Sequence, residues 1–499
     1  MRDLSPANVQ RPLRLLHGVL LSAIALFMQG GHALAQDGAG QPDGADTQRA
    51  IAHVRRVEQF EKTISALQSA HGPFDVRLME PLQGLIGTHI ENASFDAAFA
   101  LLDQQLQIQR INHGLYSAEQ IPIIETMLEL QSRAGDWPRI NDTLQYLSWL
   151  YQRDDSLPAE MQLAGLKNIG AWHLRALEQD ERVREAHHLV RLNAMEEKAA
   201  ALAEDHLGAQ SEALVPYLYD KSIAELYIAL AIMLTDDTSQ DLMLQTEGLR
   251  SRGSLGSGGG AGGLGVAEVE ALYGSRASTV IERSFKANMG ASHADLERIR
   301  DIYAITGNQE AEAMALLAMA DSVLMRQQFE DRPGNFAGVR RGTPSAGAAM
   351  MSYNDAMALL LEAGIDKARL DALTRCPVML PITVFHATVA EATPDCEHAT
   401  EPVSYVLADY NLISTLIPGL EGDNDSPDGT LEAQLRFNVR TNGQAGNMEV
   451  VSISKDSTPN RVRLRKLTEL LQFRPAMRDG VPVRAENVLL TVRIPAARE

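Results

Sequence analysis

Residues 121–151 read IPIIETMLELQSRAGDWPRINDTLQYLSWLY and predict two helices joined by a tight turn. In both halves the apolar residues recur three or four positions apart, which is the spacing of one face of a helix. Gly135 and Asp136 interrupt this pattern, and both residue types favour turns. The stretch therefore predicts a helical hairpin. Its apolar positions are Ile121, Ile124, Met127, Leu128 and Leu130, then Ile140, Leu144, Leu147, Leu150 and Tyr151.

The same hairpin pattern recurs in the chain at irregular spacing. In a later copy the turn is Gly307–Asn308, and in a looser copy upstream a break from Asn92 to Asp96 separates the two helices. Repeated units of this kind bury their apolar faces only by stacking on their neighbours, which favours an α-solenoid. The apolar positions are Leu296, Ile299, Ile302, Leu316 and Met319 in the later copy, and Leu82, Leu85, Ile86, Ile90, Phe99, Leu102 and Leu106 upstream.

These hairpins resemble tetratricopeptide repeats, because large and small residues alternate around the turn in the same way. The residues that carry the resemblance are Leu296, Ile299, Tyr303, Gly307, Ala311, Ala315 and Ala318. The resemblance implies a concave superhelix that binds proteins or peptides. An irregular helical bundle with the same periodicity is the alternative. We predict this helical region to span residues 50–332.

A glycine-rich stretch, residues 251–265, interrupts the helical pattern with the sequence SRGSLGSGGGAGGLG. Gly256 to Ala261 fits the G-x-G-x-x-A dinucleotide pattern, in which glycines let a pyrophosphate approach a helix N-terminus. That chemistry needs a preceding strand within a βαβ unit, and the segment LMLQTEGLR provides neither. We therefore predict a flexible insertion and no cofactor. Residues 333–349, rich in Gly and Pro, are predicted to form a second loop.

The N-terminus has the three parts of a secretory signal. Three arginines lie in the first 14 residues, an apolar run extends from Leu15 to Met28, and the small-residue pattern Ala33-Leu-Ala35 follows. Residues 1–35 are therefore predicted to be a cleaved signal peptide. The apolar run is shorter than the roughly 20 residues needed to cross a bilayer, and an uncleaved inner-membrane anchor is the alternative. Residues 36–49, small and polar, are predicted to be a flexible leader.

The chain is acidic, with a formal net charge of −20 over 499 residues, and −22 without residues 1–35. Such a surface repels phosphate backbones, and no dense stripe of Lys and Arg with interleaved aromatics is present. Nucleic acid is therefore excluded as a predicted partner. No later segment approaches the length of a membrane span, so we expect an exported protein in the periplasm whose membrane contact is left open.

The two cysteines, Cys376 and Cys396, both lie in the exported part. An even cysteine count in an exported chain favours a disulfide, here within the segment of helix and connecting chain predicted for residues 350–402. A zinc site formed with His386 and His398 is an alternative, although the common ligand spacings are absent, and two free thiols are another. No metal site is predicted.

The final part, residues 403–499, changes to the period-two pattern of strands. Leu431 to Val439 alternates apolar and polar residues, Asn442-Gly443 is a hairpin signal, and Met448 to Ser454 returns as a second strand. Pro459 to Gln472 predicts a helix whose apolar residues face the sheet, and Val488, Leu490 and Val492 alternate in a third strand. The predicted order is strand, strand, helix, strand. The expected sheet-facing residues of the helix are Val462, Leu464, Leu467, Leu470 and Leu471. Upstream, Val378 to Val384 also alternates, with Pro381 favouring an edge or irregular strand.

This order of elements, and the residues at the turns and strand ends, resemble the C-terminal domain of the TonB energy transducers. The residues that carry the resemblance are Gly429, Asn442, Gly443, Phe473, Pro475, Ala476, Gly480 and Pro482. Physically, Gly480 supplies a turn and Pro482 opens the last strand, where its missing N–H is tolerated. The resemblance implies that partner segments extend the sheet at an exposed strand edge. The expected edge is Thr491, Val492, Arg493 and Ile494.

The fold expected overall is mainly α, a tetratricopeptide-like solenoid followed by a small α+β domain with a TonB-like ββαβ order. A TonB transducer keeps its N-terminal helix in the inner membrane and has a long proline-rich spacer, whereas this chain has a cleavable signal and a helical region. We therefore expect an exported, non-catalytic adaptor or scaffold that binds envelope proteins. An inner-membrane-anchored, TonB-like energy transducer for outer-membrane transport is the alternative.

Catalytic patterns in the sequence lack the context that their chemistry needs. Ser452 and Lys455 match S-x-x-K, but that motif requires a helix start and here falls on a predicted strand. His187 and His188 are adjacent on a predicted helix and point to different faces, so they cannot bind one metal as an i, i+4 pair would. Neither H-E-x-x-H nor G-x-S-x-G occurs. No catalytic residue is predicted.

Overall fold

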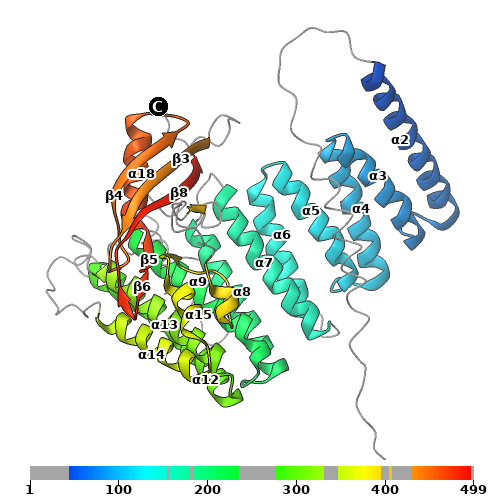
Figure 1. The fold of residues 1–499 in the computed structure, drawn as a ribbon. Helices are drawn as coiled ribbons and strands as arrows, with labels where there is room; N and C mark the ends of the chain where they lie inside the picture. Colours follow the sequence, from blue (N-terminus) through cyan, green and yellow to red (C-terminus); the bar gives the residue numbers. More distant parts are fainter. Residues whose placement is uncertain are drawn as a thin grey trace, which may run out of the picture. The chain divides into compact units, whose positions relative to one another are not determined.

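The computed structural model describes residues 44–153, 157–179, 185–234, 277–330, 347–394, 404–406 and 430–495. These residues are mainly helical, with a small strand-containing region near the C-terminal end (Figure 1). The chain divides into two compact units, residues 1–101 and 102–499. The predicted signal peptide 1–35, the glycine-rich insertion 251–265, Cys396 and Gly429 lie outside the described residues.

The first unit contains helix α2 (Gly44–His71), helix α3 (Met79–Glu91) and the start of α4 (Phe95–His113). Helix α2 begins at Gly44, so the predicted flexible leader is wrong for its last residues, because no further Gly or Pro breaks the helix before Gly72. Helices α2 and α3 pack closely where Gly84 faces Phe60. A Cβ on Gly84 would lie 2.5 Å from the Phe60 ring, so only glycine permits this approach.

The predicted hairpin turns are confirmed. Gly135 and Gly307 have φ values of +66° and +78°, which glycine adopts without strain. The amide after each glycine bonds back to the helix that it ends, Asp136 N to Gln131 O at 2.9 Å and Asn308 N to Tyr303 O at 3.0 Å. These bonds satisfy carbonyls that a helix end leaves without partners, the pattern of a Schellman motif. The same residue pattern therefore ends a helix in the same way at both turns.

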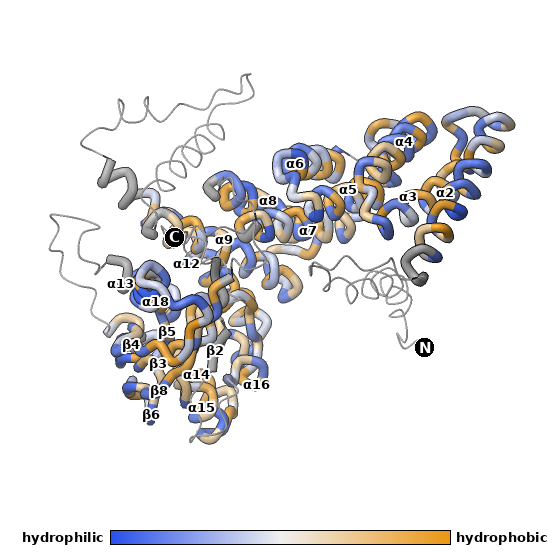
Figure 2. Tube along the Cα trace, turned by 90° about the horizontal axis from the view of Figure 1, so that it is seen from above, coloured by the Kyte–Doolittle hydropathy of each residue, from blue (hydrophilic) through white to orange (hydrophobic). Residues whose placement is uncertain are grey.

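The helices of the second unit follow one another as packed neighbours, each against the next along the described chain (Figure 1). Figure 2 shows the alternation of apolar and polar residues along them. The predicted loop 333–349 is wrong for its last three residues, because α14 already begins at Gly347. The residues that follow Gly347 are alanines and methionines, which favour a helix. The helices are α5 (Ile121–Arg133), α6 (Trp137–Arg153), α7 (Ala159–Gln179), α8 (Glu185–Leu207), α9 (Val215–Leu234), α12 (Ala277–Thr306), α13 (Gln309–Glu330) and α14 (Gly347–Glu362). Helix α15 (Lys367–Thr374) follows.

The C-terminal strands form a sheet in the order β2-β8-β3-β4, from β2 (Ser404–Val406), β3 (Thr430–Val439), β4 (Ala445–Ile453) and β8 (Ala485–Pro495). Helix α18 (Thr458–Leu470) lies between β4 and β8 in sequence, so the predicted order of strand, strand, helix, strand is confirmed. The apolar positions of β3 are buried as predicted, together with Leu464, Leu467 and Leu471. Val462 is exposed, contrary to prediction, because two positions along a helix correspond to about 200° of rotation away from Leu464.

Four shorter strands join this sheet to the helices. Strand β1 (Val378–Leu380) pairs antiparallel with β5 (Gln472–Arg474) and ends before Pro381, so it is shorter than the alternating stretch Val378 to Val384 predicted for it. Strands β6 (Met477–Arg478) and β7 (Val481–Pro482) form a hairpin. One apolar core contains Leu380 and Met477 together with residues of α9, α12, α13 and α14. The helices therefore share a core with β1 and β6, whereas the four-stranded sheet and α18 pack around a core of their own.

Candidate functional site

Two residues of the TonB-like pattern, Gly443 and Phe473, meet directly although 30 positions separate them in the sequence. The Phe473 amide donates to the Gly443 carbonyl at 2.9 Å. Gly443 has a φ of +80°, and a Cβ there would lie 2.0 Å from the Phe473 carbonyl oxygen, so the site accepts only glycine. Asn442 takes part as well, because its carbonyl accepts the side-chain amide of Gln472 at 3.0 Å. The tip of the β3–β4 hairpin is thus bonded to β5.

The rest of the pattern forms the turn that follows β5. Phe473, Pro475 and Ala476 are buried. Asp479 and Gly480 both have positive φ, +51° and +76°, as the two-residue turn of a tight hairpin requires. Gly480 therefore supplies a turn, as predicted. Pro482 does not open the last strand, because it lies in β7 opposite Met477 and β8 begins at Ala485.

Arg474, between the pattern residues Phe473 and Pro475, is the buried charge of the region. Its guanidinium forms a two-point ion pair with Asp321 on α13, with Nε 2.9 Å from Oδ1 and Nη2 bonded to Oδ2. Their side chains are only 4% and 9% exposed. The Tyr353 hydroxyl on α14 donates to the same Asp321 Oδ1 at 2.6 Å. Helices α13 and α14 are thus joined to β5 by charge-assisted hydrogen bonds.

Electrostatics favour the charged form of this pair and the neutral form of the tyrosine. Burial alone would lower the pKa of Arg474, but the adjacent Asp321 carboxylate outweighs it and raises the pKa. Burial, reinforced by Asp321, raises the pKa of Tyr353 well above its usual value. Tyr353 therefore remains a hydrogen-bond donor at all physiological pH values.

Sequence reasoning missed this network, because Asp321, Tyr353 and Arg474 lie in three separate segments and follow no spacing rule. A signal was present in the run Leu471 to Met477, where Arg474 is the charged residue in a segment that is otherwise suited to burial. A buried arginine requires an anionic partner. The identity of that partner came only from the fold.

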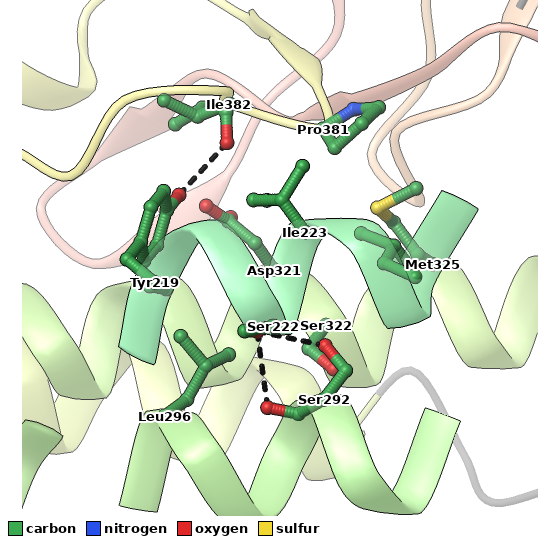
Figure 3. A pocket seen from close by; sticks show the side chains of 12 residues that line it. Tyr219, Ser222, Ile223, Ser292, Leu296, Asp321, Ser322, Met325, Pro381 and Ile382 are labelled. Atoms are coloured by element: carbon green, nitrogen blue, oxygen red, sulfur yellow. Dashed lines mark hydrogen bonds between the residues drawn. The ribbon is translucent and has the colours of Figure 1, made fainter. Parts of the chain in front are cut away.

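A hollow lies beside the network, between α9, α12, α13 and residues 381–382 (Figure 3). Its enclosed volume is about 30 Å³, which has room for a water molecule and is far smaller than a small-molecule site. The Tyr219 hydroxyl donates to the Ile382 carbonyl at 2.8 Å, and Ser222 and Ser292 are bonded through their hydroxyls at 2.9 Å. Apolar side chains form most of the remaining wall (Figure 3). These are Ile223, Leu226, Leu296, Ala318, Met325 and Pro381.

The chemistry of this hollow is that of hydrogen bonding. Asp321 faces it, but both carboxylate oxygens already accept hydrogen bonds from Arg474 or Tyr353, so the group is not free to remove a proton. The described residues that line the hollow include hydroxyls and no imidazole or thiol. The arrangement can hold a water and, among the described residues, lacks a base to activate a nucleophile.

A second buried charged group joins α9 to α12. Lys221 Nζ lies 2.6 Å from Asp295 Oδ2 and 3.3 Å from Glu225 Oε1. The second oxygen of Glu225 has no hydrogen-bond partner. Burial, opposed by Lys221 and reinforced by Asp295, raises the pKa of Glu225 to about 7. Burial likewise raises the pKa of Glu196, on α8, to about 7.

A buried histidine pair lies between α7 and α8, where His173 Nδ1 and His188 Nδ1 are 3.1 Å apart. Burial, together with His188 and His187, lowers the pKa of His173 well below its usual value. Among the described residues, no three His, Cys, Asp or Glu side chains converge on a point where a metal ion could bind. The pair is therefore best interpreted as one imidazole donating a hydrogen bond to the other.

The predicted edge, Thr491 to Ile494, is covered only at its first residue, because β2 pairs with Leu489 to Thr491 and, among the described residues, Val492 to Ile494 pair with β3 alone. Strand β8 lies inside the sheet, with β3 on one side and β2 on the other, and Thr491 is the partner of Val406. Strand β2 could not be predicted from the sequence, because its pairing with β8 is parallel and non-local. The two outer strands of the described sheet are β2 and β4.

The predicted disulfide has only one of its residues described. Cys376 is buried after α15, and Cys396 lies outside the described residues, so their pairing stays a prediction. Ser452 lies on β4, away from any helix start, as the sequence predicts. None of the helices in the described ranges is long and apolar enough to span a bilayer.

Comparison with known proteins does not assign the chain to a family. No protein-family model matches it, and no curated protein matches it. The function is therefore argued from the arrangement of the residues described above.

Proposed function

We propose that this protein is an exported, periplasmic, non-catalytic adaptor that binds protein partners through two surfaces. One surface is the face of its helical hairpins, which resemble tetratricopeptide repeats, and the other is the edge of its TonB-like sheet. The proposal requires no cofactor or metal. Support for a binding role comes from the arrangement of charge, because the buried Asp321 carboxylate is committed to Arg474 and Tyr353 and is not poised for chemistry.

The observation that carries the proposal is the position of β4. It is an outer strand of the described sheet, paired with β3 on one side only. An outer strand presents backbone N–H and C=O groups that a partner strand can use. The tip of the β3–β4 hairpin is bonded to β5, and Arg474 of β5 is bonded to Asp321 on α13, so a partner at β4 would be linked to the helices of the second unit. Tethering two partners in this way is what an adaptor does.

The test is a charge placed on the proposed edge. Val451 lies on β4 and is 40% exposed, and Val462 lies on α18 and is 48% exposed. Val451→Lys should remove proteins captured from periplasmic extract by the full chain, since a charged side chain on an outer strand opposes strand addition. Val462→Lys is the matched control and should leave capture unchanged. Unchanged capture by Val451→Lys would show that the β4 edge is not a binding surface.

N-terminal sequencing of the protein recovered from the envelope separates the adaptor from the anchored transducer. A chain that begins at Gln36 supports export after cleavage and excludes an anchor formed by residues 15–28. Recovery of the intact N-terminus in the inner-membrane fraction would favour the transducer.

A further inference from the structure

The C-terminal segment, residues 430–495, is basic although the chain as a whole is acidic. Residues 430–495 contain eleven Lys and Arg against six Asp and Glu, a net charge of +5 within a chain of −20. The remaining residues therefore carry −25 together. Such an asymmetry indicates that this part of the surface meets a partner of different charge from the rest.

Two of these cations lie at the ends of β4. Arg440 follows β3, and its guanidinium lies against the first residues of β4, where a Cβ on Gly446 would be 2.9 Å from Nε. Lys455 follows the end of β4, which spans nine residues, or about 30 Å of extended chain. Neither side chain forms an ion pair with a described residue, whereas Arg461 and Arg465 are paired with Asp456 and Glu469. The edge thus has an uncompensated positive charge near each end.

The one carboxylate on β4 is already compensated. Glu449 lies 3.3 Å from Arg436 on the neighbouring β3, so its charge does not oppose an incoming anion as a lone carboxylate would. Helix α18, which packs against β4 and contacts it through Thr468 and Met448, begins with the sequence TPNRVRLRK. The two terminal cations therefore give the edge a positive potential at each end.

We propose that the β4 edge selects an extended protein segment with acidic residues at both ends of its paired stretch, spaced to reach Arg440 and Lys455. The inference rests on the proposed function, because it takes β4 as the binding edge. A strand edge needs N–H and C=O partners, which a polypeptide supplies and a lipid surface does not. A peptide therefore fits this surface better than an anionic membrane. The two cations act mainly on selection and on the rate of encounter.

The experiment compares two fluorescent peptides with the full exported chain. Both contain the same alternating Thr-Val core of seven residues, and one has two Asp at each end where the other has two Lys. We expect fluorescence anisotropy to show the acidic peptide binding at least about tenfold more tightly at low salt. The difference should shrink to about threefold or less at 300 mM NaCl, because salt screens exposed charges.

Paired variants locate the effect. Arg440→Gln with Lys455→Gln should abolish the difference between the peptides. Arg369→Gln with Arg478→Gln removes two exposed cations on α15 and β6 and should preserve it, which excludes a general effect of net charge. Arg440, Arg369 and Arg478 are exposed and Lys455 is half-buried, and circular dichroism checks that both double variants remain folded.

The remaining outcomes overturn the inference in distinguishable ways. Equal binding of both peptides that Val451→Lys weakens would keep β4 as a binding edge and reject the acidic preference. Failure of both peptides to bind would reject the peptide partner. Binding to vesicles containing phosphatidylglycerol, lost in the Arg440→Gln/Lys455→Gln variant while neither peptide binds, would assign the cations to a membrane surface.

Discussion

Two buried charged sites in the second unit use similar residue types with different degrees of pairing. At the junction of the helices and strands, Arg474 meets Asp321 in two-point geometry and Tyr353 donates to the same carboxylate. Between α9 and α12, one lysine, Lys221, serves two carboxylates, and Glu225 keeps an oxygen without a partner. The first site has one cation for one carboxylate, and the second has one cation for two carboxylates.

The two sites contribute differently to the fold. A fully paired buried ion pair tolerates only one arrangement of its elements, and it fixes residues 153 positions apart. An incompletely paired site holds a carboxyl group whose protonation responds to pH near neutrality. The first site therefore specifies structure, and the second makes stability depend on pH. The predictions below separate these two effects.

The largest expected effect is at the junction. Asp321→Ala leaves the buried guanidinium of Arg474 without a partner, and we expect a loss of about 3–5 kcal/mol in the free energy of unfolding. Denaturant unfolding followed by circular dichroism measures it. The double variant Asp321→Leu with Arg474→Met removes both charges and should lose much less. Equal losses in the single and double variants would show that packing, and not the unpaired charge, accounts for the effect.

The incompletely paired site should make the free energy of unfolding fall as the pH rises, whereas in ordinary acid denaturation it falls as the pH drops. Because the pKa of Glu225 is raised from 4.5 to about 7, the folded state holds a proton that the unfolded state has released over this interval. The contribution of Glu225 to the free energy of unfolding is thus fully present below about pH 4.5. As the pH rises through 7, this contribution is lost, and the free energy of unfolding falls by up to about 3 kcal/mol.

Glu225→Gln keeps the shape of the protonated side chain and should flatten the fall in unfolding free energy between pH 5 and pH 8. Glu196→Gln tests the second such group, whose pKa is also about 7. Glu58→Gln, on the exposed face of α2, is the control for loss of a carboxylate. If the unfolding free energy of Glu225→Gln fell with pH as steeply as that of the unmodified chain, Glu225 would not be the cause of the pH dependence.

The order of elements was predictable from local patterns, and the pairing of distant segments was not. The hairpin turns at Gly135 and Gly307 depend on residues within one turn of helix, so the sequence alone located them. The contact of Gly443 with Phe473 and the pairing of Val406 with Thr491 join residues that no periodicity relates. For the same reason the resemblance located the pattern residues but not β2, which covers Thr491 of the expected edge.

A smaller effect should follow from removing one hydrogen bond of the paired site. Tyr353→Phe keeps the buried ring, loses the donor to Asp321 Oδ1, and leaves the two bonds from Arg474 in place. We expect a loss of about 1–2 kcal/mol in unfolding free energy. The pH dependence assigned to Glu225 should be unchanged, because the two sites do not share a residue. A changed pH profile in Tyr353→Phe would show that the sites are coupled.

The smallest effect is expected at an exposed ion pair of the same junction, between Lys367 on α15 and Asp479 in the β6–β7 turn. Their charged atoms are 2.6 Å apart, about as close as those of the buried pair of Arg474 and Asp321, but the two side chains are 70% and 71% exposed. Salt screens the attraction within such a pair, and water solvates the two charged groups nearly as well when they are apart. Lys367→Ala should therefore leave the unfolding midpoint within measurement error at 150 mM salt, whereas Asp321→Ala shifts it strongly. If the two variants shifted it equally, distance and not burial would govern the strength of charge pairing at this junction.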